Sequence, residues 1–238
     1  MIDVHFFGCS LTAGDELSDD QIFPWKHECK DATEYFLRRV PPIGYQEHNK
    51  RLAYPALLQS PEIKTFNHAK NGASIQENII SLMTLVSKNT KIDYVYFQII
   101  PSGRELVIDS KNNITSLQLA CACDPPGFER YLDAKRVSHQ PLQYSLEDFV
   151  DLIMLHGYLK NKGIKHKFLE LNKQINFRVN DLQSTKFYFL INEYYRQPIL
   201  DVSDFIKPFP KLLGDHFSKE AHCEIARLIN LDLKEINS

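Results

Sequence analysis

The best guide to the fold of this chain is the alternation of short apolar segments with longer segments of helical periodicity. Four segments rich in β-branched and aromatic residues are predicted strands: 2–7, 63–67, 93–100 and 164–172. Three segments with apolar residues at helical spacing are predicted helices: 73–87, 146–162 and 218–229. Strands separated by helices favour a parallel sheet with helices on both faces. We therefore predict a three-layer α/β fold.

The length favours a single domain over residues 1–238, because one domain commonly takes roughly 100–200 residues. An apolar fraction of 43% is enough to build its core. Two stretches break the alternation, near 26–60 and 107–145, and both are long for connections in a compact domain. We expect them to be insertions at the edge of a site or on the surface.

Composition excludes several classes of function. The net charge of −2 gives no general attraction to nucleic acid or to a membrane surface, and we expect neither as a partner. No apolar run approaches the roughly 18–20 residues that cross a bilayer, and the first residues lack the features of an export signal, so a cytoplasmic protein is expected. The oligomeric state is left open.

The cysteines favour neither disulfides nor a metal. Five is an odd number, which favours reduced thiols. Cys121 and Cys123 have one residue between them, whereas zinc-binding pairs usually have two to four. We expect no metal and no cofactor, and we expect Cys9 to be a small buried apolar residue.

The first predicted strand runs into a turn of small residues, "FFGCSLTAG", that contains Ser10. Sites in parallel α/β sheets lie beyond the carboxyl ends of the strands. Ser10, Gly72 and the segment 101–104 all fall at that end. A hydroxyl beside unpaired helix N–H groups can attack a carbonyl, and those N–H groups can receive the oxyanion. The same turn also suits a phosphate, or it is a plain strand-to-helix connection.

A histidine-containing segment near the other end, "GDHFSKEAHCEIA", favours the first of these interpretations. A serine nucleophile needs a base that titrates near neutral pH, which is the range of histidine. It also needs a third group that fixes the tautomer of the imidazole. His216, next to Asp215, and His222, in the predicted last helix, are the candidate bases.

Three segments together resemble the sequence blocks of the SGNH (GDSL-type) hydrolase superfamily. "FFGCSLTAG" is similar to the first block, usually Gly-Asp-Ser-x-Thr-x-Gly, with Cys9 in place of the aspartate. "NHAKNGASIQENI" is similar to the second block, whose glycine donates an N–H to the oxyanion, and "DHFSKEAHCEIA" resembles the last. The resemblance implies a flavodoxin-like parallel sheet with Ser10 as nucleophile, His216 as base and the Ser10 and Gly72 N–H groups as oxyanion donors. Gly-Cys-Ser in the first block resembles phage and marine bacterial members, which implies the host cytoplasm or a virion as further locations.

The acid of the predicted triad departs from this pattern. The superfamily has an aspartate three residues before the histidine, and that position is Leu213 here. Asp215 is our candidate, although side chains of adjacent residues usually diverge. Asp201, Asp204 and a dyad without an acid stay open as alternatives.

The third block also departs from the pattern, because the asparagine that normally follows the third strand is missing. The segment "PSGRE" occupies its place. Arg104 is our candidate for an oxyanion donor, since its guanidinium presents several N–H groups. It could equally bind a substrate carboxylate or phosphate, or pair with Glu105 on the surface.

These observations and the resemblance predict a serine esterase that acts on a small ester. An O-acetyl group on a carbohydrate is one candidate substrate, because the chain lacks a long apolar segment for lipid. The alternative is a non-catalytic module that binds phosphate or another ligand on the same fold.

Overall fold

The computed structural model describes residues 1–31, 34–35, 38–100, 104–108, 114–118, 141–171, 189–212 and 216–237. Its main sheet has five strands in the order β2-β1-β3-β6-β7, and every neighbouring pair is parallel. The strands are β1 (Ile2–Phe7), β2 (Ile63–Asn67), β3 (Tyr94–Gln98), β6 (Lys165–Glu170) and β7 (Ile199–Asp201). The predicted parallel sheet is confirmed.

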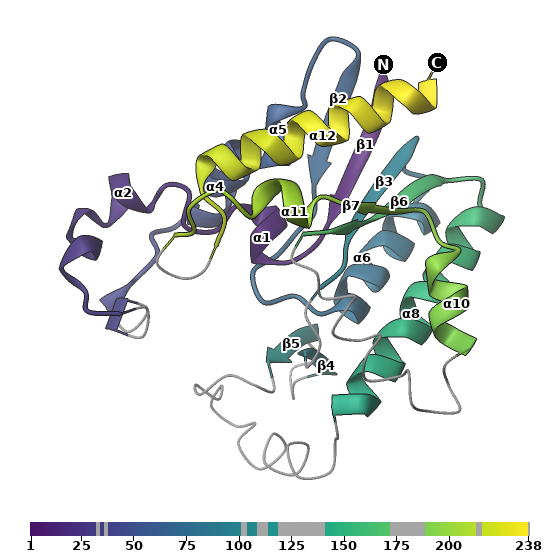
Figure 1. Cartoon of the computed structure of the whole chain (residues 1–238), viewed down its shortest axis with the longest axis horizontal. Coiled ribbons are helices and arrows are strands. Elements are labelled where there is room, and N and C mark those ends of the chain that lie inside the picture. The colour runs from purple at the N-terminus through teal and green to yellow at the C-terminus, as the bar shows by residue number, and fades with distance from the viewer. Residues whose placement is uncertain are drawn as a thin grey trace.

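Helices cover both faces of this sheet (Figure 1). One face carries α6 (Ile75–Ser87) and α8 (Pro141–Asn161), and the other carries α5 (Tyr54–Leu57), α11 (Ser203–Ile206) and α12 (Lys219–Asn237). Successive residues of a strand point to opposite faces, and β1 shows this directly. Phe7 packs in the core below α6 and α8, whereas Phe6 packs in the core below α12. The predicted three-layer α/β fold is therefore confirmed.

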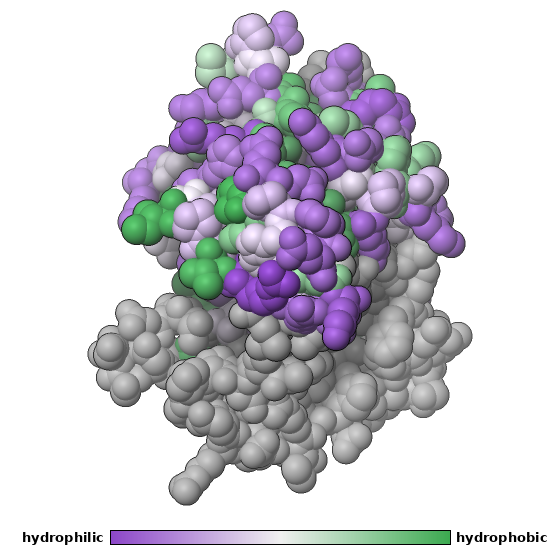
Figure 2. All heavy atoms as spheres, turned by 90° about the vertical axis from the view of Figure 1, so that its left-hand side faces the viewer, coloured by the Kyte–Doolittle hydropathy of each residue, from purple (hydrophilic) through white to green (hydrophobic). Residues whose placement is uncertain are grey.

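The first predicted insertion, 26–60, begins in η1 (Pro24–Glu28) and contains α4 (Tyr45–Leu52) and α5. It follows two short helices, α1 (Ser10–Ala13) and α2 (Asp19–Ile22). In Figure 1, α2 lies on the left-hand side of the molecule with α4 next to it, whereas α1 and α5 lie nearer the middle. The described part of that face is mostly hydrophilic, with separate apolar spots and no broad apolar surface (Figure 2).

Near the start of the second predicted insertion, a β-hairpin forms a small separate sheet. β4 (Arg104–Ile108) pairs antiparallel with β5 (Ile114–Gln118). The Ser116 hydroxyl of β5 donates to Glu77 Oε2 in the first turn of α6 at 2.6 Å and accepts from the Ser74 N–H at 2.9 Å. The hairpin therefore lies against the start of α6. A further described helix, α10 (Phe189–Tyr195), precedes β7.

Strand order fixes where a site can form. The connection from β1 leads to β2 on one side, and the next strand, β3, lies on the other side of β1. Ligands of open α/β sheets bind at such a reversal, outside the carboxyl ends of the strands. Here β1 runs into the Ser10 turn and β3 ends at Gln98 beside it. Among the described residues, no helix is long and apolar enough to cross a membrane.

Candidate active site

Ser10 is the first residue of α1, directly after the carboxyl end of β1. The preceding Cys9 is extended, with φ −105° and ψ −155°, and forms the N-cap. Ser10 is nearly buried, with 9% of its surface exposed. Its backbone N–H is among the first of the helix, and such groups have no partner within the helix. The turn therefore places the Ser10 side chain and its backbone N–H at the start of α1.

Gln98, the last residue of β3, fixes this turn. Its Oε1 accepts the Cys9 N–H at 3.0 Å and the Thr12 hydroxyl at 2.6 Å, and the side chain is fully buried. A Cβ at Gly8 would lie 2.5 Å from Gln98 Oε1 and 2.4 Å from Thr12 Oγ1, so only glycine fits before Cys9. Sequence analysis missed Gln98. The available signal was a polar amide at the end of an otherwise apolar strand.

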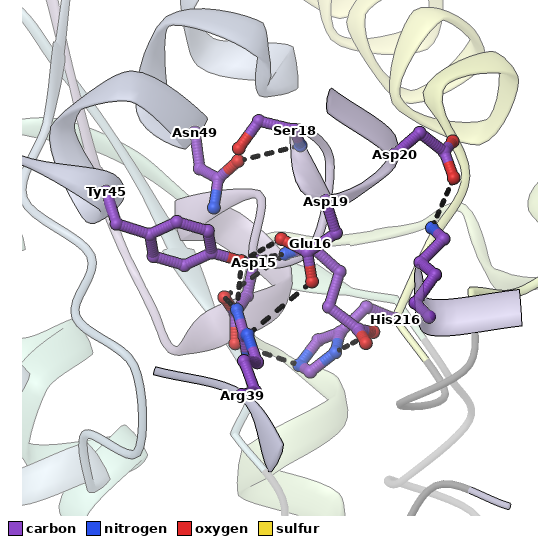
Figure 3. Close-up of polar contacts among 10 residues, drawn as sticks. Asp15, Glu16, Ser18, Asp19, Asp20, Arg39, Tyr45, Asn49 and His216 are labelled. Atoms are coloured by element: carbon purple, nitrogen blue, oxygen red, sulfur yellow. Dashed lines mark hydrogen bonds and ion pairs between the residues drawn. The ribbon is translucent and has the colours of Figure 1, made fainter. Parts of the chain in front are cut away.

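His216 lies against the loop that follows α1 (Figure 3). Its Nδ1 is 2.7 Å from Glu16 Oε2, and its Nε2 is 3.9 Å from Asp15 Oδ2. On its own segment, the His216 carbonyl accepts the Leu212 N–H at 2.8 Å. A carboxylate therefore holds one ring nitrogen, which is the arrangement that fixes a tautomer. Among the described residues, the Ser10 hydroxyl and the His216 ring share no hydrogen bond.

Glu16 is a second residue of the candidate site that sequence analysis did not identify. Its side chain is buried, with 2% exposed. Its backbone is left-handed, with φ +68°, a conformation that costs a non-glycine residue on the order of 1–3 kcal/mol and often marks functional positions. Its N–H donates to the Tyr45 hydroxyl oxygen at 3.1 Å, which helps to hold that conformation. The signal in the sequence was the acidic pair that follows the serine turn, five and six residues after Ser10.

A network of buried charges supports this loop (Figure 3). The Arg39 Nη2 donates to Asp15 Oδ1 at 2.6 Å, and Arg39 Nε lies 3.5 Å from Asp19 Oδ2. Tyr45 donates to Asp19 Oδ1 at 2.5 Å and also contacts Arg39. Burial alone would raise the pKa of Asp15, but the hydrogen bond and charge of Arg39 outweigh it and the pKa is lowered. Burial raises the pKa of Asp19, with Tyr45 and Arg39 opposing it in part.

Gly72 and Arg104 come together at the loop between β2 and α6. Gly72 is left-handed, with φ +77°, and the position of a Cβ there faces open space. The Arg104 Nη1 donates to the carbonyl of Ala73 at 3.1 Å, so its guanidinium lies beside this loop. The loop also contacts the nucleophile turn, because the Lys70 N–H donates to the Gly8 carbonyl at 3.2 Å. The two candidate oxyanion groups are therefore neighbours.

The remaining candidate residues either have defined contacts in the structure or lie outside the described residues. His222 is buried in the core: its Nδ1 accepts the Tyr54 N–H at 3.1 Å, and burial, followed by repulsion from His216, lowers its pKa to about 3. Asp201 accepts hydrogen bonds from Ser203, and within the described chain neither it nor Asp204 contacts His216. Asp215 lies outside the described residues, as do Cys121 and Cys123. Cys9 is a free thiol with 1% exposed, as expected.

No family model matches this chain, and no curated protein matches it. Solved structures do match over nearly its whole length. A protein assigned to the lipolytic G-D-S-L family from Desulfitobacterium hafniense is 13% identical, with a TM-score of 0.52 and coverage of 97% of this chain and 99% of that one. The esterase EstA from Pseudoalteromonas is 12% identical, with a TM-score of 0.50 and full coverage of both chains. The acetyl xylan esterase AlAXEase is 11% identical, with a TM-score of 0.50 and coverage of 96% and 98%.

The strand order, the two helical layers and these matches define a flavodoxin-like α/β fold, whose strand order reverses at β1 and β3. More specifically, the chain has the fold of the SGNH (GDSL-type) hydrolase superfamily, as its three sequence blocks predict.

Proposed function

We propose that this protein is a serine esterase in which Ser10 is the nucleophile, His216 the base and Glu16 the acid that orients the base. The observation that carries the proposal is the 2.7 Å contact between His216 Nδ1 and the buried carboxylate of Glu16. A carboxylate at Nδ1 leaves Nε2 as the nitrogen that accepts a proton, and it stabilises the imidazolium that forms. We prefer Glu16 to Asp215 for this role because its carboxylate lies at the ring.

In the proposed reaction, Ser10 Oγ attacks the acyl carbon while His216 Nε2 takes its proton. The imidazolium then gives this proton to the leaving alcohol as the carbon–oxygen bond of the ester breaks, which leaves an acyl group on Ser10. Water, deprotonated by His216, attacks the acyl carbon. The bond between this carbon and Ser10 Oγ breaks, the imidazolium returns its proton to Oγ, and the carboxylic acid is released. No cofactor enters any of these steps.

The oxyanion would be held by the Ser10 and Gly72 N–H groups. Arg104 supplies positive charge beside Gly72, in the region where the resemblance expects an asparagine. Gln98 stabilises the turn that carries the Ser10 N–H and is thereby a positioning residue. Donors that are fixed before the reaction stabilise the developing charge at little reorganisation cost.

A polar substrate fits the surroundings of this site. A cavity of about 420 Å³ lies between the 26–60 segment and Asn71, which directly precedes Gly72. Its lining combines the polar side chains of Arg39, Gln46, Glu47 and Asn71 with Tyr45 and two prolines, Pro41 and Pro42. Amide and carboxylate groups suit the hydroxyls of a sugar. We propose that an acetyl group is cleaved from a carbohydrate whose ring occupies this cavity.

The test of the nucleophile is labelling with a fluorophosphonate, with the adduct located by mass spectrometry. We expect one adduct on Ser10, none in Ser10→Ala, and normal labelling in Ser87→Ala, which changes an exposed serine at the end of α6. Labelling that survives Ser10→Ala would refute the assignment. Absence of labelling and of aryl acetate hydrolysis in the unchanged protein would favour the non-catalytic binding module.

The substrate class is tested with Asn71→Ala on two esters. We expect KM for an acetylated xylo-oligosaccharide to rise about 10-fold, because a hydrogen-bond partner in the cavity is lost. Hydrolysis of an aryl acetate, which has no sugar ring, should be unchanged. Equal effects on both esters would place the sugar elsewhere.

A further inference from the structure

Two buried carboxylates flank His216, one at each ring nitrogen. Glu16 Oε2 is 2.7 Å from Nδ1, and Asp15 Oδ2 is 3.9 Å from Nε2. Both belong to the loop after α1, and both side chains are at most 7% exposed. Asp15 and Glu16 are consecutive in the chain, but their carboxylates lie at different nitrogens of the His216 ring and would affect the reaction in opposite ways.

The position of Asp15 is a problem for the proposed chemistry. A base that takes a proton from Ser10 through Nε2 needs that nitrogen accessible, so a carboxylate bound there would compete with the nucleophile. Such a contact would also favour the imidazolium before any substrate arrives, because an opposite charge within about 4–6 Å raises the pKa of a histidine. The site therefore needs something that keeps Asp15 engaged elsewhere.

Arg39 meets this need from a distant part of the chain. Its Nη2 is 2.6 Å from Asp15 Oδ1, and the guanidinium is buried, with 7% of the side chain exposed. The group is held on its other side by Asp19 and Tyr45, and it lies over the Tyr45 ring at 4.6 Å. The oxygen of Asp15 that Arg39 takes is not the one nearest His216.

We propose, on the basis of the esterase function above, that Arg39 is a positioning residue of the active site. It holds Asp15 back from Nε2 of His216 and neutralises its charge, so that the carboxylate on the imidazole is the one at Nδ1. The 26–60 segment, which supplies Arg39, is in this view part of the catalytic machinery and more than a surface excursion.

Within the described residues, the charged and titratable groups around His216 come from three parts of the fold. The loop after α1 contributes Asp15 and Glu16, with Asp19 behind them, and the 26–60 segment contributes Arg39 and the neutral Tyr45. From α12, His222 is close enough for repulsion from His216 to lower its pKa, and burial keeps it neutral. Removing Arg39 therefore adds one uncompensated negative charge next to the imidazole.

The test is the pKa of His216 in Arg39→Gln, Asp15→Asn and the double variant. It is measured by NMR titration of labelled histidine, with the signal assigned by His216→Gln, and from the acid limb of kcat/KM. We expect Arg39→Gln to raise this pKa by about one unit, Asp15→Asn to lower it, and the double variant to return it near its starting value. Arg38→Gln is the matched control, because it changes an exposed arginine of the same segment and should shift nothing.

Restoration in the double variant supports the proposal, because a purely structural role of Arg39 would not be rescued by a second substitution. An unchanged His216 pKa in folded Arg39→Gln, or the same shift with and without Asp15, overturns it. If Arg39→Gln does not fold, the lowered pKa expected for Asp15→Asn decides the question alone. The NMR titration needs no turnover, so a failure of the esterase proposal, seen as missing Ser10 labelling, is distinguishable from a failure of this one.

Discussion

Replacing Glu16 with glutamine is the most direct test of the charge arrangement, because it removes one charge and keeps the shape. The carboxylate and the ring are in hydrogen-bond contact at 2.7 Å, which puts the centres of the two charges about 4 Å apart. Opposite unit charges at about 4 Å attract by about 4 kcal/mol at an effective dielectric constant of about 20. Since each 1.4 kcal/mol is roughly a factor of ten, kcat should fall by about 10³-fold. The amide counterpart of a triad aspartate costs about 10⁴-fold, which is the same order.

Glutamine also changes the pH profile in a defined direction. Without the carboxylate the imidazolium is less stable, so the pKa of His216 falls and the acid limb of kcat/KM moves to lower pH. The backbone is not the cause of any loss, because glutamine tolerates the left-handed conformation at φ +68° as well as glutamate does.

The assay is aryl acetate hydrolysis as a function of pH, together with a thermal melt. Glu62→Gln, at an exposed position beside β2, is the matched control and should leave rate and melt unchanged. A Glu16→Gln protein that melts normally and retains at least a third of the original kcat would refute the reasoning. The orienting acid would then have to come from elsewhere, with Asp215 the first candidate.

Three further outcomes follow from the same structure. Arg104→Ala should lower kcat on aryl acetates about 10-fold with an unchanged melting temperature, and equal rates would remove Arg104 from the mechanism. Gly8→Ala should destabilise the fold by about 1–3 kcal/mol in urea unfolding, because its Cβ would overlap Thr12 and Gln98; a wild-type midpoint would contradict this packing. Burial, then repulsion from His216, lowers the pKa of His222 to about 3, so the unfolded chain binds the proton first and the unfolding free energy should fall as pH drops from about 6.5 toward 3. His222→Gln should reduce that pH dependence by about one proton, and an unchanged slope would argue against a neutral buried imidazole.

The main sheet was predictable because its strands are short, apolar and separated by periodic helices. β1 and β2 begin and end at the predicted residues, and β3 and β6 lie within the predicted segments. β7 was missed because three residues carry no period, and its place in the sheet comes from pairing with β6. The β4–β5 hairpin was missed for a similar reason: its pairing is between segments, and neither strand has a distinctive pattern alone.

The residues of the candidate site differ in the same way in how well the sequence predicts them. The prediction of Ser10 and His216 rests on chemistry that is visible in short segments of sequence. Glu16 and Arg39 could not be predicted in this way, because their roles depend on contacts across 200 and 24 residues of chain, and charged residues in loops are usually solvated. Burial is what distinguishes these charged residues from ordinary charged residues on the surface, and burial is a property of the tertiary structure. The signals in the sequence, an acidic pair after the serine and an arginine in a non-periodic segment, have no meaning until the two are adjacent.

If Glu16 is the orienting acid, as we propose, it belongs to the same segment as Ser10, and this changes which parts of the fold must be positioned relative to each other. When the acid and the histidine of a triad lie in the same loop, that loop has to position both of them relative to the serine. Here Glu16 is tied to Ser10 through one short turn, in which the Asp15 N–H donates to the Ser10 carbonyl at 3.0 Å. The separation of Ser10 and Glu16 is therefore set locally, by α1 and by the left-handed Gly14 that ends it. In the proposed mechanism His216 then binds an acid that is already in position, and the Arg39 ion pair keeps the neighbouring Asp15 engaged on its other side.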